Sequence, residues 1–153
     1  MTRYSQTPIS DPFDGQLYDP EIDHAVVGAN YYHGTLGETI TAMMTVYLKS
    51  DGKFWKTDAD TLATIDALIG VALYGGNADD TVNIALPAGT FIVRDDTWAW
   101  ATIGAPVYFD GTTAGGLTDV KPSSGQLQRK AGYVLDADAV FMQLGNNTVF
   151  EVP

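Results

Sequence analysis

The chain has 153 residues, the size of one ordinary domain, and 45% of them are hydrophobic, which is enough to build a core without cross-links. It contains no cysteine, which excludes disulfide bonds and thiolate zinc sites. Its net charge of −11 disfavours binding to nucleic acid phosphates, and no apolar run approaches the roughly 18–20 residues that a membrane helix needs.

The acidic residues are sixteen aspartates and only three glutamates, and the chain also holds 16 glycines. Aspartate and glycine are common in turns, whereas glutamate favours helices, so this composition predicts many loops and few helices. The polar start of the chain, residues 1–10, lacks the apolar segment of a signal peptide. We therefore expect the protein to be made and folded in a cytoplasm.

Residues 1–36 are predicted to form an extended arm. They contain three prolines and several aspartates and glycines, and no period of 2 or 3.6 residues runs through them. Their dispersed aromatic residues need a surface to pack on, which could be the rest of the chain, a sister subunit or a different protein. The candidate partner-binding residues of the arm are Tyr4, Phe13, Tyr18, Tyr31 and Tyr32. The alternative, in which the arm packs on its own domain as a first strand, stays open.

A hairpin is predicted where apolar and polar residues begin to alternate. The alternating runs 44–49 and 54–57 flank Asp51-Gly52, a dipeptide typical of tight hairpin turns. A two-residue loop at Asp51-Gly52 pairs Leu48 with Trp55.

This register decides which side chains of the hairpin face the core. The predicted core face consists of Met44, Val46, Leu48 and Trp55. The opposite face carries two large aromatic residues, Tyr47 and Phe54, beside Lys49 and Lys56. Because both faces are rich in apolar side chains, we expect Tyr47 and Phe54 to meet a second subunit.

Further short strands are predicted at residues 70–74, 81–86 and 90–93, each followed by turn residues. The stretch 58–69 is ambiguous, because Leu62 and Ile65 have helical spacing but the threonines weaken a helix. We expect a loop there with at most one or two helical turns.

The second half of the chain repeats the order of motifs in the first half at offsets of about 60 residues. The echoes are Val107-Tyr108-Phe109 for Val46-Tyr47-Leu48, and Gly132-Tyr133-Val134-Leu135 for Gly70-Val71-Ala72-Leu73. We interpret the repeat as a duplication with similar halves at about residues 40–93 and 98–150. A simple meander of short strands is the alternative.

Many short strands with closely spaced turns predict an all-β domain over residues 37–153. The expected architecture is a small barrel of short antiparallel strands, preceded by the extended arm. A closed barrel also removes sheet edges, which matters for a protein packed at high local concentration.

No residue is predicted to be catalytic. The serines lie in the arm or in apparent turns, and the only histidines, His24 and His33, both lie in the arm. These histidines could hold a divalent ion together with Asp23 and Glu38, but no ligand motif is present. Paired aspartates elsewhere fit turns better than a calcium loop or a pair of catalytic carboxylates. We therefore predict no metal site and no cofactor.

The segment Trp98-Ala99-Trp100 places both indole rings on one face of an extended strand. Packing in the core or at a subunit interface is the expected use of such a pair. Stacking on a glycan is the alternative use.

Several runs over about residues 37–152 form one set of motifs: Val46-Tyr47-Leu48 with Asp51-Gly52-Lys53 and Trp55, Asp58-Ala59-Asp60, Ile69-Gly70-Val71-Ala72-Leu73 with Asp79-Asp80-Thr81-Val82, residues 98–109, and Gly132-Tyr133-Val134-Leu135-Asp136. Together these runs resemble small bacteriophage head-decoration and fibre-associated proteins. Such proteins are typically β-barrels, often trimeric, that sit on the capsid or form part of a fibre. The resemblance implies no catalytic residues.

Two functions follow from the resemblance as expectations. The first is a capsid decoration protein on the outer surface of the head, which binds the major capsid protein or another virion structural protein and stabilises the shell. The second is a fibre or receptor-binding module that contacts a host-surface glycan through Trp98 and Trp100. We favour the first, as a homotrimer made in the host cytoplasm, because a long acidic arm suits attachment to a neutral or basic neighbour.

Overall fold

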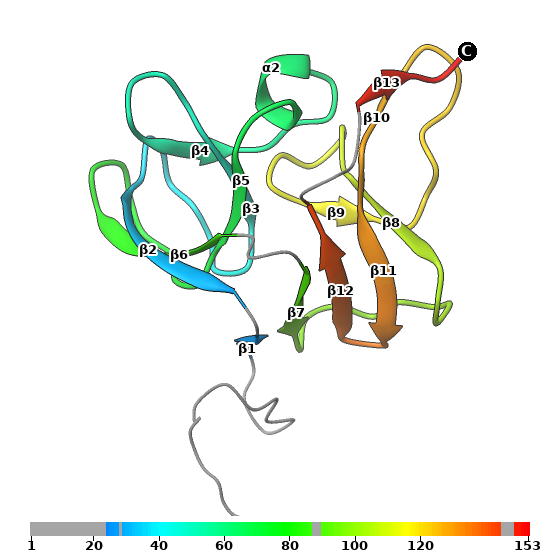
Figure 1. Ribbon diagram of the computed structural model, residues 1–153, viewed down its shortest axis with the longest axis horizontal. Helices are drawn as coiled ribbons and strands as arrows, with labels where there is room; N and C mark the ends of the chain where they lie inside the picture. The colour runs from blue at the N-terminus through cyan, green and yellow to red at the C-terminus, as the bar shows by residue number, and fades with distance from the viewer. Residues whose placement is uncertain (1–23, 28, 87–89, 145–148) are drawn as a thin grey trace, which may run out of the picture.

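The computed structural model describes residues 24–27, 29–86, 90–144 and 149–153, with the side chains of residues 24–27 left out. The described chain is nearly all β, and its strands pair antiparallel in every sheet. The predicted all-β class is therefore confirmed. Two larger sheets lie side by side, with a small two-stranded sheet at one end (Figure 1).

The first large sheet has five strands in the order β2-β6-β5-β3-β4. Its members are β2 (Asn30–Thr35), β3 (Thr45–Leu48), β4 (Phe54–Lys56), β5 (Ile69–Ala72) and β6 (Thr81–Leu86). The strands β3, β4 and β6 lie where the alternation of apolar and polar residues predicted them, and β5 overlaps the short apolar run predicted as a strand at residues 70–74. The strand β2 lies within the segment that we predicted to be an arm.

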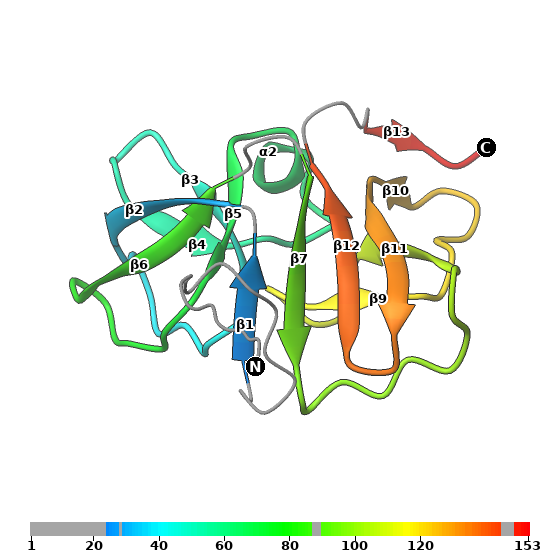
Figure 2. The same cartoon turned by 60° about the horizontal axis from the view of Figure 1, so that its bottom comes forward.

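The second large sheet has six strands in the order β1-β7-β12-β11-β8-β9. Its members are β1 (His24–Val27), β7 (Thr90–Asp95), β8 (Pro106–Phe109), β9 (Leu117–Thr118), β11 (Lys130–Asp136) and β12 (Ala139–Gln143). Figure 2 shows β1, β7, β12 and β11 as neighbouring ribbons. Without the edge strand β1, this sheet has five strands, as the first sheet does.

The remaining elements are short. The strands β10 (Leu127–Gln128) and β13 (Phe150–Glu151) pair with one another, and α2 (Leu62–Ile65) is one helical turn in the stretch where we expected one or two. Within the described residues, no helix has the length and apolar character needed to cross a membrane.

The two large sheets share one strand order. When β1 is set aside, the five strands of each sheet, numbered along the chain, lie in the order first, fifth, fourth, second, third from edge to edge. The corresponding strands are β2 and β7, β3 and β8, β4 and β9, β5 and β11, and β6 and β12. This correspondence puts the boundary between the units after β6, so that β7 begins the second unit instead of ending the first. Duplication of a single unit stays a prediction.

Neither large sheet closes into the barrel that we predicted. The five-stranded sheet curls until its two edge strands approach one another, but they are joined only by one isolated parallel bridge between Leu36 and Phe54. Gly34 permits this approach, because a Cβ atom there would lie 2.6 Å from the ring of Phe54. Among the described residues the strand pairings therefore form open sheets, one of them strongly curled.

The register of the first hairpin differs by one residue from our prediction. Leu48 pairs with Phe54, not with Trp55, because the turn holds one residue more than the two-residue loop that we expected. The amide of Gly52 donates to the carbonyl of Lys49, and Gly52 has a φ of 83°, which fits a turn followed by a left-handed residue. A shift of one residue exchanges the faces of the second strand, so Phe54 instead of Trp55 points into the core on the same face as Val46. Leu48 shares this face but lies at the end of β3 and is 36% exposed.

The hydrophobic core has two parts. The smaller part fills the curl of the five-stranded sheet and consists of Leu36, Ile40, Val46, Phe54, Ala72 and Ile84. The larger part lies between the two sheets: the outer face of the first sheet contributes Ile69 and Val71, and the second sheet contributes Phe91 and Met142 among others. The two sheets therefore share the larger part of the core.

The boundary of the predicted arm at residue 36 is wrong for its last third. Residues 24–27 pair with β7, residues 30–35 pair with β6, and Leu36 is fully buried. The alternation was hidden because β2 is an edge strand whose first four residues are all exposed. Residues 1–23 of the predicted arm lie outside the described residues.

A buried arginine ties the two sheets together. The guanidinium of Arg129 donates to the carbonyl oxygen of Ile65, next to the first sheet, and to that of Leu144, at the end of β12. Burial lowers the pKa of Arg129, while the charge of Asp66 opposes that effect. The side chain thus replaces water for two backbone acceptors from different parts of the chain.

Candidate partner-binding surface

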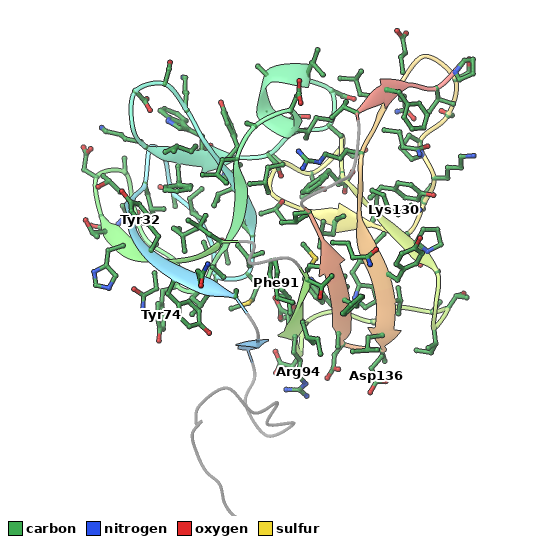
Figure 3. The ribbon with its side chains drawn as sticks, viewed as in Figure 1. Tyr32, Tyr74, Phe91, Arg94, Lys130 and Asp136 are labelled. Carbon is green, nitrogen blue, oxygen red and sulfur yellow. The ribbon has the colours of Figure 1, made fainter. Side chains whose placement is uncertain are left out.

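The most exposed aromatic side chains gather at the β2 edge of the five-stranded sheet. Tyr31 and Tyr32 of β2 are 50% and 54% exposed, Tyr74 after β5 is 60% exposed, and His33 is also exposed. We call these four residues the β2 surface. Figure 3 shows Tyr32 and Tyr74 at the end of the molecule that faces away from Lys130 and the second sheet. Such a group of exposed aromatic residues is typical of a protein–protein contact.

The β2 surface wraps around the edge of the sheet because successive side chains of a strand point to opposite faces. Tyr32 lies on the face of the small core, with its ring centroid 6.1 Å from that of Phe54. His33 lies on the other face, opposite Asn83 of β6, and together with Tyr74 it lines a shallow groove of about 290 Å³. A partner at this edge would therefore meet aromatic groups above and below the strand.

The electrostatics of the β2 surface are neutral to acidic. Burial raises the pKa of the Tyr31 phenol, and the nearby Tyr74 raises it further, so the Tyr31 phenol stays neutral at physiological pH. Two aspartates lie where the strand ends: the carbonyl of Asp80 accepts from the amide of Leu36, and Asp79 pairs with Lys53 at 2.6 Å. The partner surface should accordingly be apolar with neutral or basic surroundings.

The structure describes only two of the five candidate residues of the predicted arm. Tyr31 and Tyr32 lie in β2 and form half of the β2 surface. Tyr4, Phe13 and Tyr18 lie outside the described residues. Sequence reasoning missed Tyr74, which we interpreted only as the end of a strand. The one signal in the sequence was its place directly before Gly75-Gly76, a pair that marks the end of a strand.

The predicted interface residues of the first hairpin have different environments. Phe54 is 1% exposed inside the small core, so the prediction that it meets a second subunit is wrong, and the one-residue shift in register explains why. Tyr47 is half-buried and packs on the main core. Its pKa is raised by burial first and then by the acidic groups of Asp51 and Glu38.

Trp98 and Trp100 lie together beside the main core. Their ring centroids are 5.5 Å apart in an edge-to-face arrangement, and both side chains are half-buried against that core. Trp98 also lines an open groove of about 350 Å³ with Met43 and Leu117. The two rings contact each other, so they do not form a flat pair of platforms for a sugar.

The structure brings no metal-ligating cluster together in the part of the chain that it describes. His33 is exposed on β2, and Glu38 accepts from the amide of Lys56 and lies 3.7 Å from its ammonium group. The side chains of Asp23 and His24 lie outside the described residues. The aspartates at positions 51, 58 and 110 each accept from a backbone amide two residues ahead, which is the turn role that we expected of the aspartates.

The family model for phage cement proteins matches residues 53–141, which is more than half of the chain. The matched segment runs from the first hairpin to β12 and includes parts of both large sheets. Comparisons with curated proteins and with solved structures found no match.

Proposed function

Because the chain belongs to the phage cement protein family and is thus a capsid-stabilising structural protein, we propose that it decorates the outer surface of the head and binds the major capsid protein. Membership of the family places it in the virion among other capsid components. The family is a structural one, and the resemblance carries no catalytic residues to this chain.

The observation that carries the proposal is the β2 surface. Tyr31, Tyr32 and Tyr74 present large aromatic area at one end of the molecule, and aromatic residues are the usual anchors of protein interfaces. The net charge of −11 supports a partner surface that is neutral or basic. The fibre alternative has less support, because Trp98 and Trp100 pack on each other and on the main core.

We also propose that residues 1–23 contribute to attachment and that the protein is a homotrimer. The arm holds Tyr4, Phe13 and Tyr18 together with prolines, which suits an extended segment that docks on a neighbour. The trimer rests on the resemblance to decoration proteins. Sedimentation equilibrium at micromolar concentration tests it, and a monomer of 16.4 kDa alone would contradict it.

The direct test of the proposed function is binding to shells that lack decoration. Purified protein should bind such shells to saturation and raise the temperature at which they disassemble. A double variant, Tyr32→Ala with Tyr74→Ala, should bind at least about tenfold more weakly, since each lost aromatic anchor is worth about 1–2 kcal/mol or more. The matched control is Leu135→Ala, which removes an exposed apolar side chain from the second sheet.

The contribution of the arm is tested by a chain that starts at His24, which keeps β1 and β2. If the arm attaches the protein, the shortened chain folds with a nearly unchanged melting temperature and binds shells more weakly. Full occupancy of the shells by the shortened chain would show that attachment lies entirely in residues 24–153.

A further inference from the structure

The two large sheets differ at one pair of corresponding edges. In the second sheet the edge of β7 is covered by β1, which pairs with it over four residues. The corresponding strand of the first sheet is β2, which lies at the end of its sheet and has β6 as its single partner among the described strands. Among the described residues, no strand pairs with the outer edge of β2, and this is the strand that carries the exposed Tyr31 and Tyr32.

The hydrogen bonds of the two residues after β2 show which way the backbone groups of β2 point. The amide of Leu36 donates toward the β6 side, to Asp80, and the amide of the next residue, Gly37, donates to the opposite side, to Phe54. The register between β2 and β6 has no shift, so this alternation extends back along the strand. The amide and carbonyl of His33, an even number of residues before Gly37, therefore point away from β6 to the open side of the strand.

Charge identifies the kind of chain that fits this edge. The described surroundings of β2 include Asp79 and Asp80, and the whole chain carries −11. A second copy would bring the same acidic edge, and residues 1–23 hold five acidic residues against the single base Arg3. A neutral or basic strand from a different capsid component, with apolar side chains at alternate positions, would not be repelled by the acidic edge as a second copy or residues 1–23 would be.

We propose that β2 is a strand-addition site: an extended segment of the capsid protein pairs antiparallel or parallel with β2, with His33 as its backbone anchor. Tyr31 and His33 line one face of the added strand and Tyr32 lines the other, so main-chain bonds supply affinity and the aromatic groups select the side chains. The inference rests on the proposed function, because it names how the same surface binds the shell.

A proline at position 33 tests the role of the backbone. His33→Pro removes the outward amide and leaves the bonds to β6 in place, since proline is tolerated on the open side of an edge strand. We expect His33→Pro to bind undecorated shells at least about tenfold more weakly, the effect of losing a central backbone bond and distorting its neighbours. The matched variant His33→Ala keeps the amide and loses only the imidazole, so it should lose clearly less affinity than His33→Pro. Equal losses in both variants would overturn strand addition in favour of recognition through the imidazole.

Hydrogen exchange keeps the inference testable if His33→Pro fails to fold. In the original protein, binding to undecorated shells should slow exchange of the His33 amide by at least about tenfold, because a paired strand protects its amides. Unchanged exchange at His33 in the bound protein would overturn the inference while leaving the proposed function intact. If the original protein does not bind shells at all, the proposed function itself fails.

Hydrogen exchange on the free protein tests the two other segments that could pair with β2, namely residues 1–23 of the same chain and a second copy of the protein. Protection of His33 that is lost when residues 1–23 are removed would overturn the proposal in favour of the protein's own arm. Protection that increases with protein concentration would overturn it in favour of a second copy. Rapid exchange at His33 in both free samples supports a strand from the capsid protein.

Discussion

The five-stranded and six-stranded sheets have the same strand order but bury their inner faces in different ways. The first sheet curls over its own small core, whereas the second stays open and packs its inner face on the outer face of the first. One position accounts for much of the difference. Gly34 of β2 and Val93 of β7 are at corresponding positions, because each pairs with the second residue of its neighbouring strand, β6 or β12. The glycine lets Phe54 of the opposite edge approach β2, where a Cβ atom would clash with its ring.

The comparison teaches that one strand pattern does not fix one packing. In the first sheet the bridge between Leu36 and Phe54 joins the two edges. In the second sheet the corresponding seam, between the end of β7 and β9, is an open groove lined by Trp98 and Leu117. The second sheet therefore depends on the first for its core, whereas the small core lies within the first sheet alone.

The largest expected effects come from emptying either core. Phe91→Ala in the main core and Phe54→Ala in the small core should each lower the free energy of unfolding by about 3–5 kcal/mol. Because Ile69 and Val71 of the first sheet complete the main core, both variants should unfold in a single transition in urea. Two separate transitions in either variant would show that the sheets are independent units.

The next effect concerns two glycines at corresponding places in β5 and β11. A Cβ atom at Gly132 would lie 2.0 Å from the carbonyl oxygen of Phe141, and one at Gly70 would lie 2.7 Å from that of Ala85. Gly132→Ala should destabilise the protein by about 3 kcal/mol or more and Gly70→Ala by less, since a shift of backbone is needed in both. The control Gly52→Ala meets no atom within 4 Å and should cost about 1–2 kcal/mol for its positive φ alone. Equal effects at all three positions would refute the steric explanation.

A moderate effect is expected where the two sheets are tied by Arg129. Arg129→Met removes the bonds to the carbonyls of Ile65 and Leu144 and should cost about 2–3 kcal/mol in urea unfolding, because two buried acceptors lose a charged donor. The control Arg129→Lys keeps the charge but cannot span both carbonyls, and should recover only part of the loss. Full stability of Arg129→Met would mean that packing alone holds the sheets together.

The smallest effect concerns a buried pair of hydroxyl groups. Thr45 and Thr57 share a hydrogen bond of 2.5 Å, and the Thr45 hydroxyl also lies 3.2 Å from the carbonyl of Gly115, just before β9. Thr45→Val keeps the shape and should cost about 1 kcal/mol. A double-mutant cycle with Thr57→Val measures the share that belongs to the pair, and an additive result would assign the whole cost to the contact with Gly115.

The sequence predicted strands best where one face is buried and the other is polar. Residues 81–86 alternate cleanly and form β6 with those bounds. The first hairpin shows the limit: the turn was recognised from Asp51-Gly52, but the loop length was not, and one extra residue exchanged the predicted roles of Phe54 and Trp55. Local composition does not distinguish a two-residue from a three-residue loop, because both use glycine at positive φ.

The site was harder to predict than the fold. Tyr31 and Tyr32 were identified as partner-binding candidates from composition, but the strand that holds them was not, since an exposed edge strand has no buried face to produce alternation. Tyr74 joins them only through the pairing of β5 with β6, which is a long-range contact. The packing of Trp98 against Trp100 likewise depends on loops whose path the sequence pattern does not determine.

The crossing of the chain from β1 to β2 has a mechanical consequence. The two strands are adjacent in the sequence yet belong to different sheets, so tension on the chain ahead of His24 reaches the β1–β7 pairing first. A pull along the axis of β1 loads its four pairs in shear at the same moment, whereas a sideways pull opens them one after another like a zipper. A load borne through this end of the protein is therefore resisted according to its direction.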